Sequence, residues 1–161
     1  MRPWLKAGLI GGGVLAFLTI LTSLGTLLPS EVCTIISCCL CAPLLLAYLG
    51  TGGLAAYWLT PPRTAGEGAK EGALAGTIAG VMDSVVSMTL ALIMGAAGVY
   101  QQMLGQLSPE TLRALEEIGL GGLYTSGGII ALSCVGNICG ILWAVAMGAA
   151  GGAIMAAAKR D

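Results

Sequence analysis

The chain has 161 residues, of which 57% are apolar and 9% are Lys, Arg, Asp or Glu. Because an ordinary soluble domain is about 25% charged, this composition excludes a water-soluble globular protein. Glycine occupies 26 positions without a collagen-like period, and the mean hydropathy of +0.91 excludes a disordered linker. A net charge of −1 without a block of basic residues gives no support for binding to nucleic acid or to anionic lipid. The chain is therefore expected to be a helical protein of the lipid bilayer.

Long uncharged runs predict four transmembrane helices, since a helix needs about 20 apolar residues to cross a hydrocarbon core of roughly 30 Å. Charged residues such as Lys6, Glu31, Arg63 and Glu71 separate the runs. We expect the helices near residues 7–28, 32–59, 71–101 and 127–158. Together they predict an all-α integral membrane four-helix bundle that forms a single transmembrane domain over residues 1–161.

The basic residues predict the orientation, because Lys and Arg near the ends of spans are retained on the cytoplasmic side. Six of the seven basic residues precede the first span, join the second to the third, or follow the fourth: Arg2, Lys6, Arg63, Lys70, Lys159 and Arg160. Both termini are therefore predicted to be cytoplasmic, in a multi-pass protein of the plasma or inner membrane.

The third loop, on the extracytoplasmic side, has the pattern of a short helix. Ser108 is suited to the N-cap, Pro109 to the first helical position and Gly119 to the position just past the end. The segment is amphipathic. We expect a surface helix at about 108–118 that lies on the membrane or caps the bundle.

Small residues at a spacing of four recur in the predicted spans, and they permit the close packing by which helices associate in lipid. The third span carries Gly72, Gly76 and Gly80, and the fourth carries Gly136, Gly140, Gly148 and Gly152. Such faces pack within one chain or between chains. The sequence therefore predicts a homo-oligomer or a subunit of a larger membrane complex, with the choice left open.

Cysteines in the second and fourth spans form the first chemical feature. Cys38 and Cys41 lie three residues apart on one helical face, at a depth similar to that of Cys134, with Cys139 further along the fourth span. Small apolar packing residues are the favoured interpretation. A disulfide between the two helices and a thiol redox or metal function remain alternatives.

Asp83 is the second chemical feature, because it is the only ionisable residue deep in a predicted span. A carboxylate at that depth is costly unless it is neutral, paired or hydrated. Asn137 is expected at a similar depth, and Ser87 and Ser133 each stand four residues from one member of this pair. We predict an intramembrane polar cluster that is either a hydrogen-bonded link between helices or a proton or cation site.

The sequence contains no His and no motif of a hydrolase, a phosphate loop, a zinc site or a dinucleotide fold. We therefore expect no enzyme activity, no cofactor and no metal. The favoured hypothesis is a non-catalytic scaffold or accessory subunit that packs through its glycine-rich helix faces. The alternatives are a small proton- or cation-conducting protein centred on Asp83 and a thiol-redox membrane protein.

Overall fold

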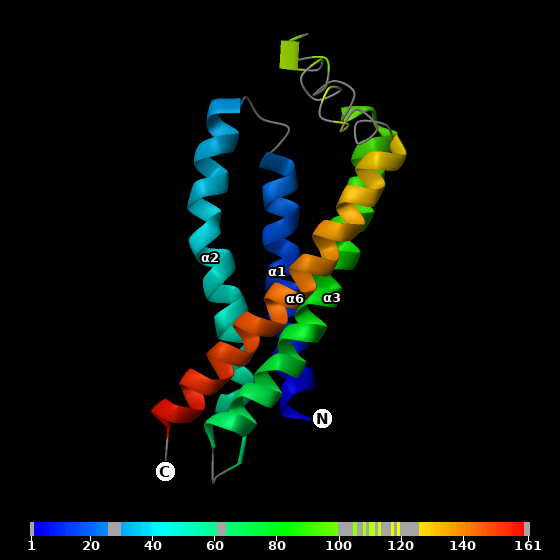
Figure 1. The fold of residues 1–161 in the computed structure, drawn as a ribbon. Helices are drawn as coiled ribbons and strands as arrows, with labels where there is room; N and C mark the ends of the chain where they lie inside the picture. The colour runs from blue at the N-terminus through cyan, green and yellow to red at the C-terminus, as the bar shows by residue number, and fades with distance from the viewer. Residues whose placement is uncertain are drawn as a thin grey trace. The chain divides into compact units, whose positions relative to one another are not determined.

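A computed structural model describes residues 2–25, 30–60, 64–99 and 126–159, together with positions 105, 108, 110, 111, 113, 117 and 119. For residues 30–38, 41, 126, 127, 129 and 130 it describes the backbone alone. These residues form four α-helices and no strand: α1 (Pro3–Gly25), α2 (Ser30–Tyr57), α3 (Ala65–Ala96) and α6 (Ser126–Ala158) (Figure 1). The prediction of an all-helical protein is confirmed.

Three of these helices contain a stretch that is long and apolar enough to cross a membrane. The stretches are Pro3–Gly25 of α1, Ala65–Ala96 of α3 and Ala131–Ala158 of α6. In α2 the apolar stretch found among the described side chains is the shorter segment Ala42–Tyr57. The helices therefore support association with a membrane, as the uncharged runs predict.

The helix α3 begins at Ala65 rather than near residue 71. Thr64 caps it, since the Glu67 N–H donates to Thr64 Oγ1 at 3.2 Å and the same hydroxyl is 3.2 Å from Glu67 Oε2. The Thr64 hydroxyl thus accepts from a free N–H group of the first turn, as an N-cap side chain does, and it donates to the Glu67 carboxylate. The end of an uncharged run marks the limit of the apolar segment, whereas the cap sets the start of the helix.

The described structure divides into two compact units. The first comprises Met1–Ser87 and Cys139–Asp161, and the second comprises Met88–Ile138. The first unit thus contains α1, α2, the N-terminal part of α3 and the C-terminal part of α6. The predicted single domain stays a prediction, and the two units are described separately.

In the first unit the fully buried apolar residues are alanines and one leucine, and many large apolar residues are exposed. The fully buried apolar residues are Ala7, Leu15, Ala55, Ala56, Ala75, Ala79, Ala144 and Ala156. By contrast, Leu46 is 67% exposed and Ile154 is 64% exposed. A water-soluble protein buries its large apolar side chains, whereas a protein packed in lipid can expose them. The surface of this unit is therefore suited to contact with hydrocarbon.

Glycines bring α3 and α6 into backbone contact. A Cβ atom added to Gly72 would collide with the carbonyl oxygen of Gly148, and one added to Gly152 would collide with that of Gly68. At Gly76 the obstructing atom is the carbonyl oxygen of Ala144. Because backbone atoms rather than flexible side chains fill the space, these positions leave no room for a larger residue.

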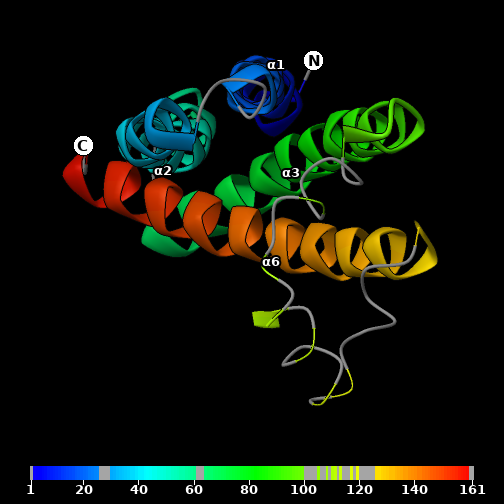
Figure 2. The ribbon, with the colours of Figure 1, turned by 90° about the horizontal axis from the view of Figure 1, so that it is seen from above.

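The helix α1 is packed by glycines against two helices. A Cβ on Gly8 would lie 3.0 Å from the carbonyl oxygen of Ala75 in α3. A Cβ on Gly11 would collide with the side chain of Thr51 in α2, which is only 2% exposed. The helices α1 and α2 consequently lie side by side (Figure 2).

Other glycines of the predicted faces have no such neighbour. A Cβ on Gly140 or on Gly136 would meet no described atom within 4 Å, whereas one on Gly80 would lie 2.9 Å from Ala144 Cβ. Along α6, the small residues at intervals of four therefore include some that pack against another helix and some that have no described neighbour.

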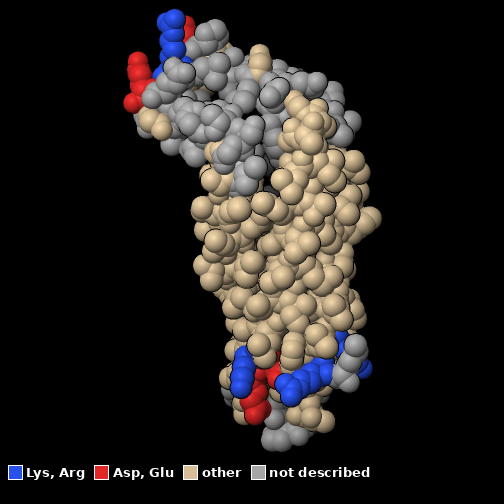
Figure 3. All heavy atoms as spheres, turned by 90° about the vertical axis from the view of Figure 1, so that its right-hand side faces the viewer, with Lys and Arg blue, Asp and Glu red and all other residues tan. Residues whose placement is uncertain are grey.

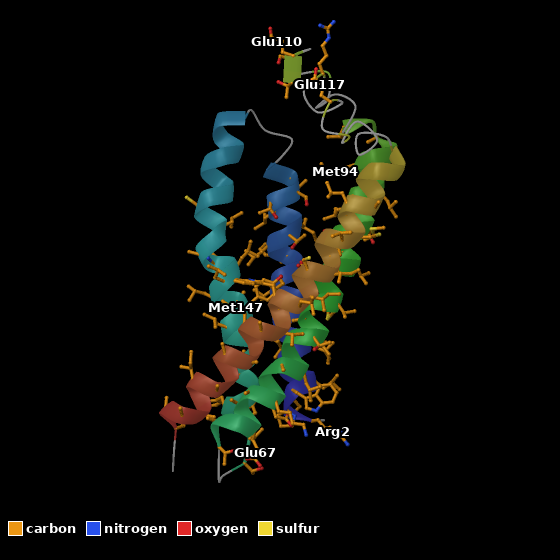
Figure 4. All side chains as sticks on the ribbon, in the orientation of Figure 1. Arg2, Glu67, Met94, Glu110, Glu117 and Met147 are labelled. Atoms are coloured by element: carbon orange, nitrogen blue, oxygen red, sulfur yellow. The ribbon has the colours of Figure 1, made fainter. Side chains whose placement is uncertain are left out.

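Apart from Asp83, the charged side chains that the structure describes in the first unit gather at one end of it. Arg2 and Lys6 lie at the start of α1, Glu67 and Lys70 at the start of α3, and Lys159 follows α6. Figure 4 shows Arg2 and Glu67 at this end, and blue and red atoms lie close together in the lower part of Figure 3. The start of α1 and the end of α6 thus lie on the same side of this unit.

In the second unit α3 ends at Ala96, shortly before Gly98, whose φ of 72° is left-handed. Farther along, the Thr111 N–H donates to Ser108 Oγ at 3.3 Å, and Gly119 has a φ of 75°. The helix predicted at about 108–118 falls largely outside the described residues and stays a prediction.

Candidate functional site

Asp83 links three helices of the first unit. From α1, the Thr19 hydroxyl donates a hydrogen bond to Asp83 Oδ1 at 2.5 Å. From α2, the Tyr48 hydroxyl donates to Asp83 Oδ2 at 3.1 Å. All three side chains are partly buried. Each carboxyl oxygen of Asp83 therefore has a hydroxyl donor from a different helix.

The glycine contacts explain how these side chains meet. Gly12 of α1 packs against α3, where an added Cβ would lie 3.3 Å from Ala79 Cα. Thr19 lies two helical turns beyond Gly12, and Asp83 lies one turn beyond Ala79. Gly12 and Thr19 share one face of α1, and Ala79 and Asp83 share one face of α3. The close approach of the two helices at Gly12 therefore brings Thr19 within hydrogen-bonding distance of Asp83.

The packing of α2 against α1 positions Tyr48 beside Asp83 in the same way. It stands three residues before Thr51, which is buried against Gly11 of α1. Residues three apart share a helix face, so the α2 face that packs on α1 also presents Tyr48 to the carboxyl group. The sequence analysis missed Tyr48, although a tyrosine far from the ends of an apolar run was a visible signal.

Of the cluster predicted from sequence, Ser87 lies one turn beyond Asp83 on α3, within the first unit. Ser133 and Asn137 belong to the second unit, so the pairing of Asp83 with Asn137 stays a prediction. The hydrogen bonds of the first unit instead assign Thr19 and Tyr48 to the carboxyl group.

The hydroxyls that follow Thr19 along α1 bond to their own helix. Thr22 Oγ1 lies 2.9 Å from the carbonyl oxygens of Leu18 and Thr19, and the Ser23 hydroxyl donates to the Thr19 carbonyl at 2.8 Å. Bonds of this kind satisfy a hydroxyl inside lipid without a partner helix. These two hydroxyls therefore donate to backbone carbonyls within α1.

The cysteine predictions are only partly within the described side chains. Cys134 and Cys139 are exposed free thiols, as is Cys39. The side chains of Cys38 and Cys41 lie outside the described residues, so a bridge from α2 to α6 stays untested. Among the residues that the structure describes, no three Cys, Asp or Glu side chains are grouped as a metal site.

Comparisons with protein families, with characterised proteins and with solved structures found no match. The chemistry of the site therefore has to be inferred from its geometry. A carboxyl group with one hydroxyl donor on each oxygen can hold three helices in register, and a carboxyl group that is only partly buried can also exchange a proton.

Proposed function

We propose that this chain is a small non-catalytic membrane protein, a scaffold or accessory subunit whose helices are fixed by glycine contacts and by one carboxyl group. The observation that carries the proposal is the bonding of Asp83, the only Asp, Glu, Lys or Arg deep in the predicted spans, to hydroxyls of two other helices. Hydrogen bonds of this type between membrane helices stabilise association. The Asp83 carboxyl group would thereby stabilise the packing of three helices.

In this proposal the four helices form a bundle with both termini in the cytoplasm and a short surface helix in the third loop. The gathering of Arg2, Lys6, Lys70 and Lys159 at one end supports that orientation, since basic residues are retained on the cytoplasmic side. The membrane would then be the plasma or inner membrane.

The proposed assembly with a second copy, or with a larger complex, uses the part of α6 that is open within the chain. A Cβ atom added to Gly140 would meet nothing within 4 Å, and Trp143, which shares its helix face, is 54% exposed. A small residue beside a large exposed one permits close approach of another helix in lipid.

Substitution of Asp83 tests the structural role. Asp83→Asn keeps a polar group of the same size that accepts a hydrogen bond from one hydroxyl, whereas Asp83→Leu accepts none. We expect Asp83→Asn to retain most of the thermal stability in detergent and Asp83→Leu to lower it. Equal stability of Asp83→Leu and the unmodified protein would contradict the proposal.

A proton- or cation-conducting protein centred on Asp83 is the second candidate function. The observation that favours it is the partial rather than complete burial of this carboxyl group. An ionisable residue within a membrane often marks an ion pathway. This candidate differs from the first in requiring a titrating group at position 83, not only a hydrogen-bonding one.

A further inference from the structure

An apolar groove of about 670 Å³ runs along the first unit between α2 and α6. Its walls are large side chains such as Leu46, Leu54 and Ile154. Its floor contains three glycines, Gly50, Gly53 and Gly151. Gly151 packs against the Leu49 backbone, whereas a Cβ at Gly50 would meet nothing within 4 Å and one at Gly53 nothing closer than 3.9 Å, so the absence of side chains at Gly50 and Gly53 leaves the groove open.

The length of the groove matches one leaflet of a bilayer. Along α2 the lining extends from Leu46 to Tyr57. At the helical rise of about 1.5 Å per residue, this is about 16 Å, close to half of a hydrocarbon core of roughly 30 Å. An acyl chain of a single lipid can therefore lie along the whole groove.

A positive charge stands at the end of the groove. Tyr57 lines this end, and the Lys159 ammonium lies 4.1 Å from the centre of the Tyr57 ring. The contact holds the lysine beside the groove while leaving its ammonium hydrogens available. Trp58, which is 39% exposed, follows Tyr57 at the same end of α2, as expected for a residue at the membrane interface.

We propose that this groove binds one anionic phospholipid, with an acyl chain over Gly50 and Gly53 and the phosphate against Lys159. The sequence carries no basic block, yet the fold sets one ammonium group where a lipid headgroup would lie. A second copy of the chain is a poorer occupant. A parallel copy related by a twofold axis would bring its own Lys159 to the same level, and like charges would then face each other.

The test is lipid binding to the purified full-length chain in detergent, measured by native mass spectrometry. Phosphatidylglycerol and phosphatidylcholine with identical acyl chains are the probes. One nearby lysine is expected to favour the anionic lipid about fivefold for the first bound molecule. Lys159→Gln should bring the ratio of the two affinities close to one while leaving phosphatidylcholine binding unchanged.

Gly50→Leu tests the groove itself, because a Cβ at Gly50 meets nothing within 4 Å and the new side chain fills the floor without a backbone collision. It should weaken the binding of both lipids more than fivefold. Gly13→Leu is the matched control, since Gly13 of α1 is also open and does not line the groove. It should bind both lipids as the unmodified chain does.

Three outcomes would overturn the proposal. The first is equal affinity of the unmodified chain for the two lipids. The second is unchanged lipid binding by Gly50→Leu. The third is that Gly50→Leu abolishes dimers of the chain while added phosphatidylglycerol does not dissociate the dimers of the unmodified chain. That result would assign the groove to a second copy. The effect of Lys159→Gln decides the headgroup contact even if Gly50→Leu fails to fold.

Discussion

Two stretches of α6 carry the same small-residue spacing and differ in what surrounds them. At Gly148 and Gly152 the backbone of α3 occupies the place of a Cβ atom, whereas a Cβ atom at Gly140 would meet nothing within 4 Å. The difference shows that small residues every four positions give a helix the capacity for close approach. The neighbouring helices determine where that capacity is used.

The largest effect is expected at the contacting stretch. Gly148→Leu places a side chain against the Gly72 carbonyl and should lower the free energy of unfolding by about 3 kcal/mol, because a backbone obstacle cannot move aside. Unfolding in lipid bicelles measures the change.

Gly140→Leu is the matched control for this comparison. It should leave the unfolding free energy within about 0.5 kcal/mol of that of the unmodified chain. The same variant should reduce the population of oligomers if the open stretch contacts another helix. Equal destabilisation by the two substitutions would show that the comparison within α6 is wrong.

An intermediate effect is expected for the hydroxyls that bond to Asp83. Tyr48→Phe removes one donor and Thr19→Val removes the other, and each should lower stability by about 1 kcal/mol, the scale of a hydrogen bond between membrane helices. A double-mutant cycle with Asp83→Leu isolates the bond. If Tyr48→Phe lowers the free energy of unfolding as much in the Asp83→Leu background as in the unmodified chain, the Tyr48 hydroxyl and the Asp83 carboxyl group do not interact.

The smallest effect is expected at the cap of α3. Thr64→Ala removes the acceptor of the Glu67 N–H and should cost about 0.5 kcal/mol, because the site is exposed. Faster amide hydrogen exchange at residues 65–68 would report the loss. Thr60→Ala, at an exposed threonine outside the helices, serves as a control and should leave this exchange unchanged.

The long apolar stretches of α1, α3 and α6 were predictable because charge is excluded from hydrocarbon, so runs with no charged residue, or in α3 with Asp83 alone, mark them directly. The start of α3 was also present in the sequence, as the capping pair Thr64 and Glu67. A boundary placed by charge alone overlooks a cap that lies beyond the apolar segment.

The partners of Asp83 were not predictable in the same way. A carboxyl group in a span requires polar neighbours, and the sequence offers Ser87, Asn137 and several threonines without ranking them. The choice of Thr19 and Tyr48 depends on the rotation of α1 and α2, which is set by where Gly8, Gly11 and Gly12 meet other helices. Spacing reveals a packing face, but it does not reveal the partner of that face.

The most direct test of the structural role of Asp83 is proton flux in proteoliposomes. The unmodified chain, Asp83→Asn and protein-free vesicles are compared under an imposed pH gradient, at equal protein density for the two variants. A scaffold fixed by this carboxyl group predicts the same slow dissipation in all three. Rapid dissipation by the unmodified chain, lost in an Asp83→Asn variant that keeps its thermal stability, would contradict the account and identify Asp83 as part of a proton pathway.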